Sequence, residues 1–172
     1  MIKYLKDLYL SADIDHGIAR RMRNEPDIRD WCRAHTDISH YQQCRWSESI
    51  EDDMTVKMFA IMQHELGQVG VCGFTSIDRL NRSAEFSCYI GKKYQREGFA
   101  TKALQTLFKH GFDDWNFHRI WGETFDGNPA LKLFLTLGMT VTGIDREAYF
   151  KKGKYIDSHR IDILSKEFKW SP

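Results

Sequence analysis

The feature that most constrains this chain is the run Gln95–Ala100, which joins an alternating stretch to an amphipathic one. Apolar and polar residues alternate from Ala84 to Ile90, as in a strand. After Gly98, apolar residues recur at helical spacing through Phe112. A helix start presents unpaired N–H groups, and a glycine there lets an anion approach closely. The junction therefore predicts a phosphate-binding turn, with an ordinary strand-to-helix turn as the alternative.

The rest of the chain predicts a single α+β domain over residues 1–172, because no repeat, linker or low-complexity tract divides it. Its hydrophobic fraction of 42% is enough for one sizeable core. The expected elements, in order, are a strand at 8–10, a helix capped by Ser11 or Asp13, a helix from Pro26 with Trp31 and Cys32 on its apolar face, a helix after a capping box at Ser39 and Gln42, strands at 56–62, 68–77 and 84–90, a helix at 100–112, a strand at 119–125, a helix at 129–137, and strands at 139–144 and 155–164 with a turn at Lys152–Lys154.

Charge composition argues against several classes of partner. Twenty-five basic and twenty-four acidic residues leave a net charge of +1, so no global field recruits nucleic acid or an anionic membrane. The N-terminus lacks a signal-peptide pattern, and no uninterrupted apolar run approaches ~18 residues. We therefore expect a soluble cytoplasmic protein with neither a nucleic-acid nor a membrane partner. A homodimer is left open.

Cysteine, histidine and tryptophan usage points to packing and not to metal or redox chemistry. The cysteines form no C-x-x-C pair and are expected to be buried thiols. The histidines show no paired ligand spacing, so no metal is expected. Apolar patterns predict core or pocket-wall positions for most of the tryptophans. The residues concerned are the thiols Cys32, Cys44, Cys72 and Cys88 and the indoles Trp31, Trp46, Trp115 and Trp121.

The spacing Q-x-x-G-x-A at Gln95–Ala100 resembles the coenzyme A pyrophosphate loop of the Gcn5-related N-acetyltransferase (GNAT) family. The order of elements also resembles that fold from end to end. The resemblance implies a mixed, mostly antiparallel central sheet flanked by helices. Within the family, the segments Arg23–Ile28, Ile38–Trp46, Arg146–Tyr149 and Gly153–Asp157 are similar to the branch of ribosomal-protein alanine acetyltransferases and certain amino-sugar acetyltransferases.

The resemblance implies acetyl-CoA as co-substrate and a defined set of residues for it. In the family, the strand before the loop parts from its neighbour, and its exposed backbone pairs with the pantetheine arm. Backbone amides at the helix start would meet the pyrophosphate. An asparagine after the next strand contacts pantetheine in the family, although simple capping is the alternative here. The expected cofactor-binding residues are Cys88, Tyr89, Ile90, Gln95, Arg96, Glu97, Gly98, Phe99, Ala100, Thr101 and Asn128.

Amine acetylation needs a base for the amine, a donor for the oxyanion and a proton source for the departing thiolate. Glu85 is the expected base, because it alternates with apolar residues just before the pantetheine segment; a solvent-facing strand residue is the alternative. Many relatives use a tyrosine as the acid, but the matching position here is Phe134, which has no proton to give. Tyr149 is a candidate substitute, and a structural hydroxyl packed beside Phe150 is its alternative. Tyr155 is a weaker candidate, and water is a further proton source.

The sequence thus predicts an acetyl-CoA-dependent N-acetyltransferase that moves an acetyl group to a primary amine by direct attack in a ternary complex. The acceptor would be a protein N-terminus, an amino sugar or another small amine. A carboxylate-rich cleft would favour polyamines, whereas an open groove would admit a peptide. The alternative, raised by Phe134, is a non-catalytic acyl-CoA-binding module that lost its general acid.

Overall fold

The computed structural model describes residues 8–169. They form a seven-stranded mixed sheet with helices on its faces, which confirms the predicted α+β class. The elements, in chain order, are β1 (Leu8–Ser11), α1 (His16–Arg23), α2 (Pro26–Arg29), α3 (His40–Glu51), β2 (Lys57–Gln63), β3 (Gly67–Asp78), β4 (Ser83–Ile90), η2 (Lys92–Tyr94), α4 (Phe99–Lys109), η3 (His110–Asp114), β5 (Arg119–Phe125), α5 (Ala130–Thr136), β6 (Thr140–Lys151) and β7 (Lys154–Leu164).

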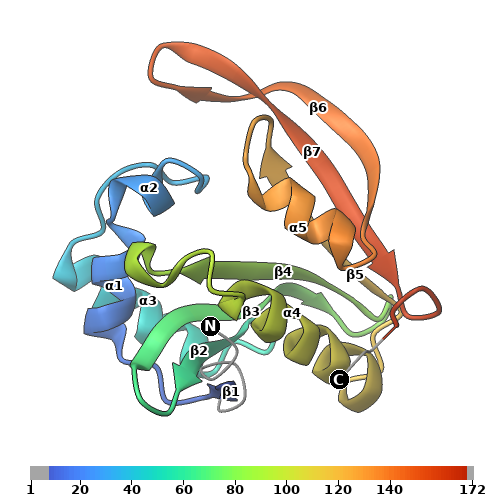
Figure 1. Ribbon diagram of the computed structural model, residues 1–172, viewed down its shortest axis with the longest axis horizontal. Helices are drawn as coiled ribbons and strands as arrows, with labels where there is room; N and C mark the ends of the chain where they lie inside the picture. The colour runs from blue at the N-terminus through green and yellow to red at the C-terminus, as the bar shows by residue number, and fades with distance from the viewer. Residues whose placement is uncertain (1–7, 170–172) are drawn as a thin grey trace.

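The sheet has the strand order β1-β2-β3-β4-β5-β7-β6. Its strand pairs are antiparallel, except that β4 and β5 run parallel. Figure 1 shows the two halves of the sheet opening like a V, with α4 across the lower strands and α5 on the upper ones. The open end of the V lies beside α1 and α2.

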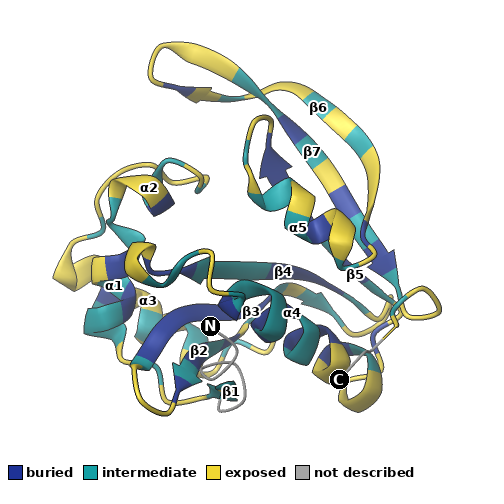
Figure 2. Ribbon diagram, viewed as in Figure 1, coloured by how far each residue is buried: buried dark blue, intermediate teal, exposed yellow. Residues whose placement is uncertain are grey.

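Helix α4 supplies much of the core, as its apolar spacing predicts. The ring of Phe86 on β4 packs edge-to-face on Phe108 of α4 and Phe134 of α5, with centroids 5.4 and 5.1 Å apart. Figure 2 shows this buried interior against the exposed strand β6. The side chains that α4 buries are Phe99, Ala103, Leu104, Leu107 and Phe108.

The first helices begin and end differently from the expectation. Helix α1 is capped by Asp15, whose Oδ1 accepts a hydrogen bond from the Ile18 N–H at 2.8 Å. Ser11 cannot cap it, because Ser11 still belongs to β1 and pairs with Ala60. Pro26 opens α2 as predicted, and the capping box at Ser39 is confirmed.

Several residues expected in the core lie nearer the surface. Helix α2 ends at Arg29, so Trp31 and Cys32 fall outside it. The side chains of Trp31, Trp46 and Trp115 are exposed, so a core position is wrong for them and the pocket-wall alternative stays a prediction. Trp121 is half-buried on β5. Of the cysteines, Cys72 is buried, whereas Cys32, Cys44 and Cys88 are half-buried thiols.

The last hairpin is longer than predicted. Strand β6 continues past Ile144 to Lys151 across two irregularities in its pairing with β7. The predicted turn is confirmed at Lys152 and Gly153, whose φ angles are +49° and +79°. Two successive positive φ angles match the right-handed twist of a tight hairpin. The extra length carries Tyr149 and Lys151 toward α2.

A close contact between β4 and β5 should control the stability of the sheet. A Cβ added at Gly122 would lie 2.5 Å from Cε1 of Phe86. We expect Gly122→Ala to lower the free energy of unfolding by about 1–3 kcal/mol, because the buried ring must shift. Urea denaturation checks this value.

The matched control is Gly143→Ala in β6, where an added Cβ meets nothing within 4 Å. Its free energy of unfolding should change by less than about 0.5 kcal/mol. Equal urea midpoints for the two variants would show that the Phe86 contact does not limit the packing of β4 and β5.

Candidate functional site

The turn before α4 is built to expose backbone donors. The Gln95 side chain donates from Nε2 to the Ile90 carbonyl at 3.1 Å, which ties the turn to the end of β4. Arg96 and Gly98 both have positive φ, at +65° and +85°. The first helical bond runs from the Lys102 N–H to the Gly98 carbonyl at 3.1 Å. The N–H groups before Lys102 are therefore left for an anion.

The remaining residues of the turn differ in their exposure to solvent. The Phe99 side chain is buried in the core beside Tyr94, so only its backbone faces the turn. Arg96 and Glu97 are exposed, whereas Ala100 and Thr101 are half-buried in the first turn of α4. The predicted pyrophosphate segment thus lies together at one helix start.

Strands β4 and β5 pair over only three positions, from Ser83 opposite Arg119 to Glu85 opposite Trp121. Beyond Glu85, β4 pairs with β3 alone, so its backbone on the β5 side has no strand partner. The predicted pantetheine residues Cys88, Tyr89 and Ile90 lie in this separated half. An extended ligand with amide groups could add to the free edge as a strand does.

An ionic cluster lies where the strands part. Arg33 donates from Nη2 to a Glu85 carboxylate oxygen and from Nε to a Glu123 oxygen, which bridges β4 and β5. Glu85 is only 6% exposed, so the solvent-facing alternative for it is wrong. Thr75 donates to the other Glu85 oxygen at 3.3 Å.

Tyr149 joins the same cluster from β6. Its hydroxyl donates to Oε1 of Glu123, and its ring packs on Phe125 at a centroid distance of 4.8 Å. Ser158, which is fully buried, donates to Oε2 of the same carboxylate at 3.3 Å. The structure therefore brings the two predicted catalytic residues, Glu85 and Tyr149, to one ionic network joined by Arg33 and Glu123.

These contacts shift the protonation of the site's groups. Burial, and then the hydrogen bond to Glu123, raise the pKa of Tyr149, so its hydroxyl keeps its proton across the physiological range. Burial disfavours the charge on Arg33, but the hydrogen bond and attraction to Glu85 outweigh it and raise its pKa. Burial also raises the pKa of the Cys88 thiol to about 12. Cys88 is therefore not a thiolate at neutral pH.

The other predicted residues occupy structural positions. The Asn128 side chain accepts a hydrogen bond from the Ala130 N–H at 3.0 Å. Asn128 therefore makes the capping contact that was the alternative to cofactor binding. Phe134 is buried, and its ring packs edge-to-face on Phe86. Tyr155 is exposed and stacks with Phe150 at 5.1 Å. No three His, Cys, Asp or Glu side chains within residues 8–169 group closely enough to hold a metal ion.

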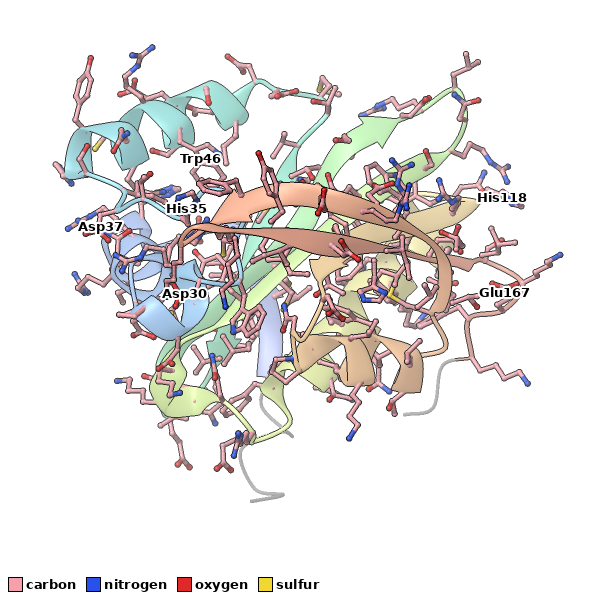
Figure 3. All side chains as sticks on the ribbon, turned by 90° about the horizontal axis from the view of Figure 1, so that it is seen from above. Asp30, His35, Asp37, Trp46, His118 and Glu167 are labelled. Atoms are coloured by element: carbon pink, nitrogen blue, oxygen red, sulfur yellow. The ribbon has the colours of Figure 1, made fainter. Side chains whose placement is uncertain are left out.

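The segment 30–39, which has no regular structure and carries Arg33, is fixed by side-chain donors. Arg23 donates to the Ala34 carbonyl at 2.9 Å, and Asn24 donates to the Ile38 carbonyl at 2.9 Å. From the hairpin tip, the Lys151 ammonium donates to the carbonyls of Asp30 and Cys32. Figure 3 shows Asp30 at the hairpin-tip end of the molecule and Glu167 at the other.

Sequence reasoning missed Arg33 and Glu123. Glu123 carried a weak signal, because it is a charged residue between Gly122 and Thr124 in a strand whose apolar positions predict burial. Arg33 carried none. It lies 52 residues from Glu85 in the chain and on a segment without periodicity.

Comparison with known proteins identifies the family. A model described as "Acetyltransferase (GNAT) domain" matches residues 8–140. The chain is 34% identical over 151 residues to an uncharacterized N-acetyltransferase, p20, of Bacillus licheniformis, with 84% of each chain covered. This chain belongs to the GNAT family, and it is an acetyl-CoA-dependent N-acetyltransferase.

Relatives with named acceptors differ from the branch expected from sequence. Spermidine N(1)-acetyltransferase of Vibrio cholerae is 27% identical over 117 residues, covering 67% of this chain and 68% of that one. Ribosomal-protein-serine acetyltransferase of Escherichia coli is 28% identical over 102 residues, covering 59% and 56%. These matches support the family but not the alanine or amino-sugar branch.

A solved structure shares the fold. The crystal structure of spermidine N-acetyltransferase from Vibrio cholerae, in complex with CoA and spermine, matches with a TM-score of 0.90 over 94% of this chain and 98% of that chain. At 24% identity, this likeness shows the fold alone. Among residues 8–169, no helix is long and apolar enough to cross a membrane.

The contact between the hairpin and the segment 30–39 can be tested with Lys151, which is 6% exposed. Replacing Lys151 by Met keeps an unbranched side chain but removes the ammonium, which lies 4.0 Å from the centroid of the Phe125 ring. It also leaves the carbonyls of Asp30 and Cys32 without this donor. We expect a loss of about 1–3 kcal/mol in the free energy of unfolding, and faster proteolysis within residues 30–39.

The control for this contact is Lys152→Met, because Lys152 is exposed and pairs with the Asp30 carboxylate at the surface. Its effect should stay below about 1 kcal/mol. If both variants have the same free energy of unfolding and are cleaved at the same rate, Lys151 does not hold the segment 30–39 against the hairpin.

Proposed function

We propose that this enzyme transfers an acetyl group from acetyl-CoA to a primary amine by direct attack in a ternary complex. The observation that carries the proposal is the parting of β4 from β5 beside the open N–H groups at the start of α4. One ligand can span both features only if it joins a diphosphate to an extended amide chain. Coenzyme A has that chemistry.

In this proposal the cofactor lies along residues that expose backbone groups. The amides from Arg96 to Thr101 bind the pyrophosphate, and the free edge of β4 at Cys88–Ile90 pairs with the pantetheine amides. Gln95 positions the turn through its bond to Ile90. The Asn128 amide group, whose oxygen is used in capping, offers its NH₂ to the pantetheine arm.

The acyl group then ends near the ionic cluster. Glu85 accepts the proton of the acceptor amine, directly or through water, and the neutral amine attacks the thioester carbon. A backbone N–H of the separated half of β4 meets the oxyanion. The thiolate leaves and takes a proton from Tyr149 or from water.

Direct attack is favoured over an acyl-enzyme because the cysteine on the pantetheine segment is a poor nucleophile. Burial holds the pKa of Cys88 near 12, so the thiolate needed for acyl transfer is scarce at neutral pH. Cys32, also within the region of the acceptor, has its pKa raised by burial as well. A ternary complex needs neither thiol.

The loop assignment predicts that Gly98→Glu abolishes CoA binding. The new side chain and its negative charge would stand against the pyrophosphate, and a non-glycine residue is strained at φ +85°. Isothermal calorimetry with CoA measures the affinity.

Gly153→Glu is the matched control, because it adds the same charge at φ +79° in the hairpin turn, where an added Cβ meets nothing. CoA affinity should survive in this control. Wild-type affinity in Gly98→Glu would reject the loop as the pyrophosphate site.

The base assignment predicts that Glu85→Gln lowers turnover most at pH values below the pKa of the acceptor amine. Most of the amine is then protonated, and a base is needed to remove the proton. CoA affinity should change little, because Glu85 does not face the pyrophosphate turn. Steady-state rates across pH measure the effect, and a pH–rate profile identical to wild type would remove Glu85 from the mechanism.

A further inference from the structure

We propose that Arg33 selects the acceptor, and that the preferred acceptor carries an acid group beside its primary amine, as an α-amino acid does. The inference rests on the proposed function, because it concerns the amine that enters the same site. It starts from the position of one guanidinium. Arg33 lies on the irregular segment 30–39, yet it bridges Glu85 and Glu123 on two different strands.

The acceptor amine and Arg33 need the same oxygens. To lose its proton to Glu85, the amine must reach a carboxylate that Arg33 already holds. An incoming ammonium therefore competes with the guanidinium. A purely cationic acceptor that displaces Arg33 from Glu85 supplies no anion in return, so the guanidinium loses one of its two carboxylate partners and keeps only Glu123.

A zwitterion resolves this competition by exchanging partners. Its ammonium takes the place of the guanidinium on Glu85, and its carboxylate pairs with the guanidinium that is released. The planar fork of arginine suits a carboxylate, and the Arg33 side chain is 49% exposed, so its outer edge is within reach of a ligand. The charges are paired before and after binding.

Two further arginines, Arg20 and Arg23, contact the segment that carries Arg33. Arg23 donates to the carbonyl of Ala34, the residue after Arg33, and its charge also acts on the Tyr89 hydroxyl on the cofactor strand. Nη1 of Arg23 and Nε of Arg20 are buried, with no hydrogen-bond partner in the described part of the chain. The carboxylates of the segment, Asp30 and Asp37, are already paired with Lys152 and Arg29. The unpartnered donors of Arg20 and Arg23 therefore favour an acceptor with an acid group over one that is only cationic.

The acid group of the acceptor takes no part in bond making or bond breaking. The amine nitrogen forms a bond to the thioester carbon while the carbon–sulfur bond breaks, and the sulfur leaves with the electron pair. One amine proton passes to Glu85, and the thiolate gains a proton from Tyr149 or water. The acceptor carboxylate remains on Arg33 throughout and fixes the amine in place.

The test compares α-amino acids with their carboxamides and with spermidine at one fixed pH of about 7, where the α-amino acids carry an ammonium group. Wild-type enzyme should show kcat/KM at least tenfold higher for an amino acid than for its carboxamide or for spermidine. Arg33→Gln should lose the preference for the acid over the amide by raising KM more than it lowers kcat. It should also raise kcat/KM for spermidine.

Lys109→Gln is the matched control, because Lys109 pairs with Asp113 at the C-terminal end of α4 and its side chain is 47% exposed, close to the 49% of Arg33. It should keep the wild-type preferences. Calorimetry with CoA on the wild type and both variants separates the proposed role of Arg33 from the proposed function. Two results would overturn the role of Arg33 alone, provided that CoA still binds. The first is a wild-type enzyme that prefers spermidine, and the second is an Arg33→Gln variant that keeps the wild-type ratio of kcat/KM for the amino acid to kcat/KM for its carboxamide. Acetylation of no amine, or failure to bind CoA, overturns the proposed function as well.

Discussion

Strands β4 and β5 run parallel for three residue pairs and then separate, and the arrangement of the site depends on that separation. The Phe86 ring, the first residue past the last pair, fills the space over Gly122 and packs on α4 and α5. Because Gly122 has no side chain, the strands meet closely on one side of this ring. Beyond it, the β4 backbone turns toward the start of α4 with one edge free.

Contacts made by charged side chains join the elements at the open side of the V. Arg33 brings the segment after α2 against both halves of the sheet, through Glu85 on β4 and Glu123 on β5. Lys151 and Lys152 hold the neighbouring residue Asp30 from the hairpin tip. The ionic cluster and the contacts beside it therefore join three parts of the chain that are distant in sequence.

Local patterns were enough to predict most of the fold. Strand alternation, the capping box at Ser39, Pro26 at a helix start and the Lys152–Gly153 turn each report a local interaction, and the structure contains all of them. The candidate pyrophosphate turn belongs to the same class, because a glycine before an amphipathic helix is a local signal. Errors arose where an element ended early, as at Trp31, or continued through irregular pairing, as in β6.

The candidate site was less predictable, because its contacts join residues far apart in the chain. Glu85 was found through its place in a strand, but periodicity could not reveal its contacts with Arg33 and Thr75. Tyr149 was found by resemblance, whereas its partner Glu123 was not. Contacts that join three distant parts of the chain produce no regular spacing of residues that a sequence pattern could detect.

The most direct test of the account is amide hydrogen exchange with and without CoA. The free edge of β4 at residues 86–90 and the first turn of α4 at residues 98–101 should both gain protection when CoA binds, while the outer strand β6 should not. Protection confined to other elements, or none in either segment at saturating CoA, would contradict the claim that the separated strand and the helix start bind one cofactor.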